Sequence, residues 1–254
     1  MTTEYSHSIR NRLFIVLSGD DLEYVVTNND RQVVTFGKAA VTDKAMLADV
    51  LANTPPLSEI FSTVDLIWSH TSFVTYPQAF TSSNDQRDLY KVSHKLRASD
   101  RLETGTLNAD IALTYAVTYD LLQLVKTKFP NVTYHHEIES LFKYTHAELK
   151  ALGESIVICC DTTQTLMIVK NGQQLKLINR YDTKDLDDVF YFVMLAVEQL
   201  ELDIENLTLN WVDASDDKSY NGIADMFASY IKKISKIELH PNISSALSTA
   251  ITCA

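Results

Sequence analysis

Short apolar stretches separated by polar turns open the sequence and predict three β-strands, a helix and a fourth strand. The predicted strands span residues 12–17, 22–27, 32–36 and 64–69, and the predicted helix runs from the Thr42-Asp43 cap to residue 52. Gly19 and the run Asn28-Asn29-Asp30 fall between strands, and these residue types favour turns. Several strands followed by a capped amphipathic helix and a further strand are typical of an α/β protein.

The same order of elements returns in the second half of the chain. Strands are predicted at residues 155–160, 166–170, 174–179 and 207–212, and helices at 185–201 and 220–234. Asn171-Gly172 is expected to form a hairpin turn with positive φ at both positions, and Asp182-Thr183 is expected to cap the first helix. The repeated order predicts an internal duplication; two unrelated α/β segments that share an order of elements are the alternative.

A stretch of different character separates the two halves. It predicts helices at residues 85–97, 120–129 and 137–144 and strands at 106–117 and 132–135, and the C-terminal stretch 242–253 predicts a further helix. Pro130 and Gly153 fit boundaries between these pieces. We therefore expect three parts: a first half at residues 1–75, an α/β insert subdomain at 76–152 and a second half at 153–254.

The composition narrows the class of protein. Of the 254 residues, 46% are hydrophobic and 22% are charged, which is typical of a globular protein with a large core. The formal net charge of −11 counts against a general nucleic-acid or anionic-membrane surface. Residues 1–12 lack the apolar core of a secretion signal, and no apolar run approaches the ~18 residues of a membrane span. Cys159, Cys160 and Cys253 indicate no disulfide framework, so the expected location is the cytoplasm.

A duplicated unit of three antiparallel strands, a helix, a strand and a further helix resembles the actin-like ATPase fold, which is ribonuclease H-like. The insert looks most like the small extra subdomain of the pilus-assembly and cell-division members of that superfamily. Residues 179–185, 190–192 and 198–202 resemble more closely an uncharacterised bacterial family of unknown function to which the same fold is assigned. This resemblance covers the whole chain, and it implies a fold but no particular reaction.

The resemblance also implies where a nucleotide would bind. In active members of the superfamily, two strand–turn–strand hairpins hold the phosphates and the metal through backbone N–H groups, glycines and an acidic residue. The first turn here keeps Ser18 and Gly19, but Leu17 stands at the position of the acid, and Asp20 and Asp21 would put negative charge beside the phosphates. The second turn, Asp161-Thr162-Thr163, has no glycine, and the turn expected to meet adenine, residues 213–217, lacks the glycine pair.

Three altered turns disfavour ATP hydrolysis, so we expect no catalytic residue, no metal site and no cofactor. Under the alternative, a nucleotide-binding protein or ATPase would hold Mg-ATP through Ser18, Gly19, Asp161, Thr162 and Thr163. Without a nucleotide, Asp161, Thr162 and Thr163 are expected to form an ordinary polar turn in which short side chains bond nearby backbone groups.

Other clusters of reactive side chains have plainer interpretations. His135-His136 precedes Glu137, but adjacent strand residues face opposite ways and no second ligand pair has zinc spacing, so we expect a surface pair where a strand meets a helix. Cys160 lies in an apolar strand and is expected to be a buried, inert thiol. The basic cluster is expected on the solvated face of a helix and consists of Lys232, Lys233 and Lys236.

The sequence therefore predicts a cytoplasmic protein of actin-like fold with degenerate nucleotide motifs and a non-catalytic role, binding or scaffolding another protein. Two alternatives remain. One is an ATP-binding protein with a non-standard phosphate grip, and the other is a peripheral component of an envelope assembly machine, as the pilus-assembly relatives are. The sequence predicts no nucleic-acid partner and no integral membrane segment, and it leaves the oligomeric state open.

Overall fold

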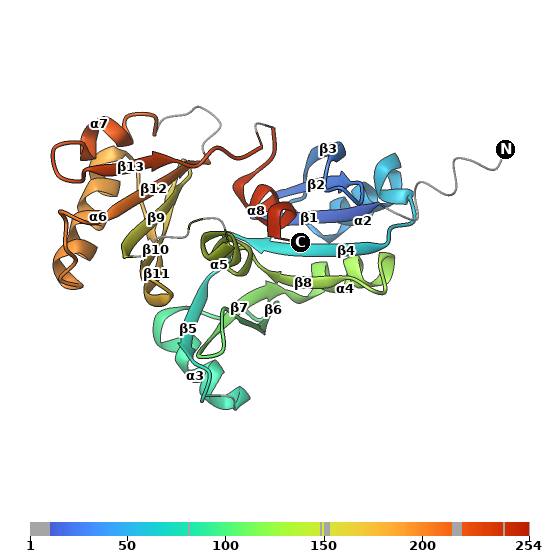
Figure 1. Ribbon diagram of the computed structural model, residues 1–254. Helices are drawn as coiled ribbons and strands as arrows, with labels where there is room; N and C mark the ends of the chain where they lie inside the picture. The colour runs from blue at the N-terminus through green and yellow to red at the C-terminus, as the bar shows by residue number, and fades with distance from the viewer. Residues whose placement is uncertain are drawn as a thin grey trace. The chain divides into compact units, whose positions relative to one another are not determined.

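The computed structural model describes residues 11–80, 82–147, 149, 153–214, 220–240 and 242–253 (Figure 1). The chain divides into two compact units. The first unit comprises Met1–Lys143 with Ala246–Ala254, and the second comprises Tyr144–Ser245. The expected bounds of three parts, at residues 75 and 152, stay a prediction, because this division does not separate an insert.

A five-stranded mixed sheet lies at the centre of the first unit. Its strands are β1 (Arg12–Ser18), β2 (Asp21–Thr27), β3 (Val33–Ala40), β4 (Thr63–Ser69) and β8 (Thr133–His136), in the order β3-β2-β1-β4-β8. The first three strands are antiparallel neighbours, whereas β1, β4 and β8 run parallel. Residues 13–17 of β1 are all buried, as expected for a central strand covered on both faces.

Several helices accompany this sheet. They are α2 (Lys44–Asn53), α4 (Tyr119–Lys128), α5 (Glu137–Ala147) and α8 (Ser245–Cys253), with a 3-10 turn η1 at Pro55–Ser58. The Asp43 side chain accepts a hydrogen bond from Met46 N and caps α2, as the sequence predicts. Thr54 and the prolines that follow it end the helix. Arg31 Nη1 donates to the carbonyl oxygen of Thr252 over 2.7 Å, which joins the β2–β3 turn to α8.

A second, three-stranded antiparallel sheet belongs to the same unit. It consists of β5 (Phe73–Pro77), β6 (Asp100–Thr106) and β7 (Ile111–Thr118) in the order β5-β7-β6, and α3 (Ser83–Ser93) packs against it (Figure 1). A single strand at residues 106–117 was expected here, but the chain turns at Asn108, whose Oδ1 accepts from Asp110 N and Ile111 N. These two hydrogen bonds from the backbone to the Asn108 side chain stabilise the turn between β6 and β7.

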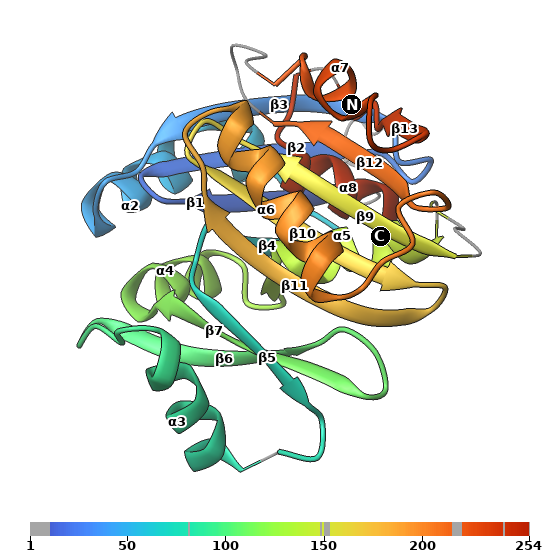
Figure 2. The ribbon, with the colours of Figure 1, turned by 90° about the vertical axis from the view of Figure 1, so that its left-hand side faces the viewer.

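The second unit is built on a sheet of the same design. Its strands are β9 (Glu154–Cys160), β10 (Gln164–Asn171), β11 (Gln174–Asp182), β12 (Thr208–Asp213) and β13 (Lys233–Lys236), in the order β11-β10-β9-β12-β13. Helix α6 (Leu186–Gln199) packs on one face of this sheet, with α7 (Ile223–Phe227) beside it (Figure 2). The core combines β9, β10 and β12 with the inner face of α6.

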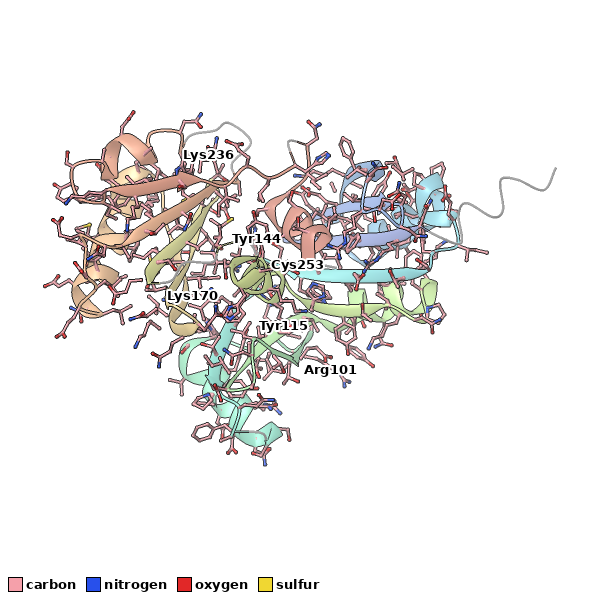
Figure 3. All side chains as sticks on the ribbon, in the orientation of Figure 1. Arg101, Tyr115, Tyr144, Lys170, Lys236 and Cys253 are labelled. Carbon is pink, nitrogen blue, oxygen red and sulfur yellow. The ribbon has the colours of Figure 1, made fainter. Side chains whose placement is uncertain are left out.

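The two sheets share both strand order and strand direction. In each, three antiparallel strands come first along the chain, and two further strands extend the sheet in parallel on the other side. A tryptophan occupies the same place in both: Trp68 pairs with His136 at the end of β8, and Trp211 pairs with Lys236 at the end of β13. Lys236 Nζ lies 5.0 Å from the centroid of the Trp211 ring (Figure 3).

Helix α6 begins and ends with recognisable caps. Asp185 is its N-cap and accepts from Asp188 N, so the cap lies three residues after the predicted Asp182, which ends β11 instead. At the other end, Leu202 N donates to Val197 O and Glu201 N donates to Glu198 O, with Glu201 at φ 52°. This is the Schellman pattern, in which the position held by Glu201 usually carries glycine.

Three further expectations are wrong. The predicted helix 220–234 is instead α7 followed by β13, because Ile231, Ile234 and Ile237 fit helical spacing but parallel pairing with β12 holds this segment extended. The cluster Lys232, Lys233 and Lys236 therefore lies on and beside a strand. The hairpin turn is Gly172-Gln173, with positive φ at Gly172 but not at Asn171, as a type II′ turn requires. The predicted strand 132–135 is present as β8 and pairs with β4, and the bounds of the insert stay a prediction.

None of the helices within the described residues has the length and apolar character that a membrane crossing requires.

Candidate functional site

The carboxyl ends of β1 and β4 form the most distinctive polar site of the first unit. The two strands are parallel neighbours, and the last residue pair in their register is Ser18 with Ser69. After β1 the chain turns back into β2 on one side, whereas after β4 it leaves the sheet for β5 and returns on the other side only at β8. In open α/β sheets, ligands bind outside the carboxyl ends of strands at such a switch point. The location favours these residues as a functional site.

A buried carboxylate holds the backbone that follows β4. Glu137 is 7% exposed, and its Oε1 accepts from the backbone N of His70 over 2.8 Å. Its Oε2 accepts from Ser69 Oγ over 2.6 Å. His70 has φ 56°, a left-handed conformation that costs a residue with a Cβ roughly 1–2 kcal/mol. Such strain persists where surrounding contacts over-determine it, and it marks functional sites more often than others.

The exposed side chain of His70 reaches the end of β1. Ser18 Oγ and His70 Nδ1 lie 3.0 Å apart, and the tautomer decides which of them donates. A hydroxyl beside an imidazole can pass its proton to the ring when it attacks an electrophile. Glu137, however, binds His70 through the backbone amide, so the hydrogen bonds of Glu137 position the residue as a whole and do not place a carboxylate on Nδ1.

His135 and His136, expected as a surface pair, are instead packed into the protein. His136 is fully buried, with its ring 5.3 Å from Phe73 and 5.2 Å from Tyr115, which is labelled in Figure 3. His135 Nε2 lies 2.8 Å from Ser140 Oγ, and burial lowers the pKa of His135 to about 4. Pairing of β8 with β4 draws both residues inward, which a surface-pair interpretation could not anticipate. Among the described residues, no group of three or more His, Cys, Asp and Glu side chains is placed to hold a metal ion.

Glu139 is a second buried carboxyl beside this site. Its Oε1 accepts from His136 N over 3.0 Å, and it packs so closely on Gly105 that a Cβ at that position would collide with the carboxylate. Burial raises the pKa of Glu139, and its backbone hydrogen bonds with His136 and Thr106 act in the opposite direction. Glu139 therefore joins β6 to α5 and explains why glycine occupies position 105.

The turn after β1 is short. It consists of Gly19 and Asp20, with φ 57° at Gly19, and the carbonyl oxygen of Asp20 accepts from Val41 N over 2.6 Å. Asp21 is the first residue of β2 and forms an ion pair of 3.4 Å with Lys38. Ser18 and Gly19 are thus neighbours in the first unit, as predicted from the chain.

The turn after β9 is held by its own aspartate. Asp161 Oδ1 accepts from Thr163 N over 2.8 Å and from Gln164 N over 2.9 Å, and Thr163 Oγ1 lies 3.2 Å away. Thr162 is exposed at the tip. These bonds are those of the polar turn expected without a nucleotide. Asp161, Thr162 and Thr163 lie together in the second unit, whereas Ser18 and Gly19 belong to the first.

Cys160 ends β9 inside the core of the second unit. It is fully buried, and burial raises the pKa of its thiol above the usual range. In the register of the parallel pair β9–β12, Cys160 lies opposite Asp213 at the end of β12. No disulfide joins the three cysteines, all of which lie in the described part of the chain. Of the turn expected to meet adenine, Asp213 and Ala214 are described, and residues 215–217 lie outside the described residues.

A buried lysine, Lys170, has a structural explanation. It is 3% exposed, and its Nζ donates to the carbonyl oxygen of Thr145 over 3.2 Å (Figure 3). Thr145 lies in the last turn of α5, where cations stabilise the unpaired carbonyls of a helix. Burial lowers the pKa of Lys170.

Sequence comparison places the chain in a family. Residues 2–234 match the family described as "Protein of unknown function (DUF3822)". The chain belongs to the DUF3822 family. No curated protein matches the sequence.

Solved structures establish the fold of this DUF3822 protein. A Bacteroides thetaiotaomicron VPI-5482 protein "with actin-like ATPase fold and unknown function" matches with a TM-score of 0.84 at 15% identity, covering 100% of both chains. The "PilM-PilN type IV pilus biogenesis complex" matches at 0.54 and 9% identity, covering 89% of this chain and 88% of that one. The ethanolamine utilization protein EutJ from Carboxydothermus hydrogenoformans matches at 0.51 and 11% identity, covering 95% and 89%. At these identities the likeness confirms the predicted actin-like ATPase fold and extends no further.

The residues missed by sequence reasoning are Ser69, His70 and Glu137 acting together. From the sequence, Glu137 is considered only as part of a possible metal motif. The available signal was the place of Ser69 and His70, directly after a buried strand parallel to β1.

Proposed function

We propose that this DUF3822 protein is a non-catalytic protein-binding or scaffolding module built on the actin-like ATPase fold. The observation that carries the proposal is the pair of hydrogen bonds from Thr163 N and Gln164 N to Asp161 Oδ1. A phosphate-binding turn needs backbone N–H groups that converge on the anion. Here a carboxylate of the same turn takes two of them, and its charge would repel a phosphate at the same place.

The first turn supports the same conclusion. Its two residues, Gly19 and Asp20, leave little backbone to wrap around an anion, and Asp20 exposes a carboxylate there. Asp21 forms an ion pair with Lys38, so the positive charge of this lysine is partly neutralised. The shared strand order of the two sheets supports an origin by internal duplication. An actin-like framework would then be kept while its turns lost the ability to bind a nucleotide.

The proposed setting is the cytoplasm, with another protein as partner. The net charge of −11 speaks against nucleic acid as that partner. The similar PilM structure was solved as a complex with PilN, and its fold supports a protein-binding role for an actin-like chain. A place beside an envelope assembly machine is one form of this role. Co-purification of the tagged chain with an inner-membrane protein, retained after a salt wash, would support that form.

The competing function is nucleotide binding through Ser18, Gly19, Asp161, Thr162 and Thr163. Its support is the position of Ser18 and His70 at a switch point of the sheet. Thermal denaturation with and without Mg-ATP separates the two functions. A dissociation constant of about 10 µM would add about 2.7 kcal/mol at about 1 mM Mg-ATP and raise the melting temperature by several degrees.

We expect no such rise and no phosphate release above the rate of a heat-denatured sample. A rise that Asp161→Ala abolishes would overturn the non-catalytic proposal. Asp88→Ala is the matched control, because it removes an exposed carboxylate from α3 and lies outside the residues of the competing site.

A further inference from the structure

Helix α6 is apolar around nearly its whole circumference. Residues 189–197 include no charged side chain. Val189, Val193, Ala196 and Val197 are buried against the sheet of the second unit. A helix with one face on a sheet normally carries polar residues on the other, and a helix that is apolar all round is normally covered on both sides.

The side of α6 that faces away from the sheet is apolar at its centre. Tyr191 is 59% exposed, and Met194 and Leu195 are half-buried. Tyr191 and Leu195 lie opposite Val189 and Val193 because successive helical residues turn by about 100°, whereas Met194 lies at the edge of this side and also packs against the core. Asp187 and Glu198 continue the same stripe at its two ends. We call this stripe, Asp187, Tyr191, Met194, Leu195 and Glu198, the α6 outer face.

Neighbouring aromatic rings hold the α6 outer face in place. Tyr181 stacks on Phe192 with 4.3 Å between ring centroids, and Phe192 meets Tyr191 edge-on at 5.2 Å. On the other side of the helix, Phe190 lies 5.2 Å from Tyr230, which is 50% exposed. Rigid aromatic side chains lose little conformational entropy on binding and are enriched at the centres of protein interfaces.

Acidic residues border this apolar centre. Asp187 and Asp188 lie in the first turn of α6, and Glu198 and Glu201 lie at its end. Lys184, just before the helix, adds one positive charge against these four negative ones. A partner that covers the centre must place its own charges next to this rim, and complementary charges favour a basic partner.

We propose that the α6 outer face is a docking surface for a basic amphipathic helix of another protein. The inference rests on the proposed protein-binding function and names the partner's chemistry. A second copy of this chain fits less well. Two α6 helices packed face to face would set acidic rims against each other in either direction, and each chain carries a net charge of −11.

Fluorescence anisotropy with synthetic helical peptides tests the proposal. The probe is a labelled peptide of about 18 residues built from leucine and lysine, with leucines at the spacing of one helical face. A peptide of the same composition in scrambled order and one with glutamate in place of lysine are the comparisons. Ionic strength of about 0.15 M screens non-specific attraction to the acidic chain.

Two variants of the α6 outer face and two matched controls complete the test. We expect Tyr191→Ala and Glu198→Lys each to weaken binding of the leucine–lysine peptide by about tenfold or more. Val92→Ala and Asp88→Lys change an exposed apolar residue and an exposed acid on α3, and they should leave binding within about twofold of wild type. Melting curves of all four variants establish that they fold.

Three results would overturn the proposal: equal binding of the scrambled or glutamate peptide, equal binding by the α6 variants, or no binding at all. A dimer in sedimentation that Tyr191→Ala dissociates would assign the face to a second copy instead. Mg-ATP melting shifts are measured on the same samples. A melting shift with Mg-ATP would contradict the proposed function. Failure of the wild-type protein to bind the leucine–lysine peptide, with no Mg-ATP shift, would contradict the α6 assignment alone.

Discussion

The backbone N–H of His70 donates to Glu137 Oε1 over 2.8 Å, and this bond joins residues that are far apart in the sequence. Because Glu137 is buried and also accepts from Ser69, it fixes the left-handed backbone at His70. That backbone in turn places the His70 ring beside Ser18. One carboxylate at the start of α5 thus determines the geometry at the ends of β1 and β4.

Removal of this carboxylate should be costly. Glu137→Ala removes the acceptor of the His70 N–H and of the buried Ser69 hydroxyl and is expected to lower the free energy of unfolding by about 3 kcal/mol, whereas Glu137→Gln, which keeps one acceptor, should cost about 1 kcal/mol. Urea denaturation measures both. Adding His70→Gly to Glu137→Ala should recover about 1 kcal/mol, because glycine adopts φ 56° without a Cβ penalty. Equal losses for Ala and Gln would contradict the role given to the carboxylate.

The end of α6 should be improved by glycine. Glu201 occupies the left-handed position of a Schellman cap with φ 52°, and its charge lies near the negative end of the helix dipole. Glu201→Gly is expected to stabilise the protein by about 0.5–1 kcal/mol. Glu201→Ala, which removes the charge but keeps the Cβ, should gain less. A loss of stability in Glu201→Gly would show that the glutamate makes a contact worth more than the strain.

Stability should fall in mild acid because of His135. Burial lowers its folded-state pKa to about 4, against 6.5 in the unfolded chain, while Asp65 raises the pKa and Lys143 lowers it. Between these values the unfolded chain binds more protons, so stability increases with pH there. From pH 7.5 to 5 the loss attributable to His135 is about 2 kcal/mol.

His135→Gln is the variant that isolates this effect. It should lose less stability than wild type between the same pH values in urea titrations. Glu139, whose pKa burial raises, titrates with the opposite sign and is unchanged in both proteins. An equal pH dependence in His135→Gln would assign the acid sensitivity to other groups.

Cys160 should be chemically inert in the folded protein. Its thiol is fully buried with a raised pKa, whereas Cys159 and Cys253 are half-buried. Alkylation by iodoacetamide, followed by peptide mass spectrometry, should modify Cys160 at least about tenfold more slowly than Cys159. In concentrated urea the rates should converge. Rapid native-state alkylation of Cys160 would mean that β9 opens readily or that the thiol is reachable.

Local patterns were sufficient for much of the fold. The hairpins of both sheets follow apolar stretches separated by polar turns, and Asp43 caps α2 as predicted. Strand β6 was missed because its sequence, Arg-Leu-Glu-Thr-Gly-Thr from Arg101, is polar and pairs only with β7. Strand β13 was taken for a helix because the spacing of Ile231 and Ile234 fits one face of a helix, whereas pairing with β12, which is distant along the chain, holds the segment extended.

The site was less accessible to sequence reasoning. The polar turn at Asp161 follows from adjacent residues and was anticipated. Ser18, His70 and Glu137 come together only because β1, β4 and β8 pair in the folded sheet. Their spacing along the chain does not predict this contact. Burial of His135 and His136 has the same origin, since both lie on the strand that pairs with β4.

Calorimetric titration with Mg-ATP tests the central claim most directly, because it reports binding whether or not hydrolysis follows. With Asp161 occupying the backbone donors of its own turn, the heats should equal those of dilution up to about 1 mM nucleotide. A saturable isotherm with one site per chain, weakened by both Ser18→Ala and Asp161→Ala, would contradict the account.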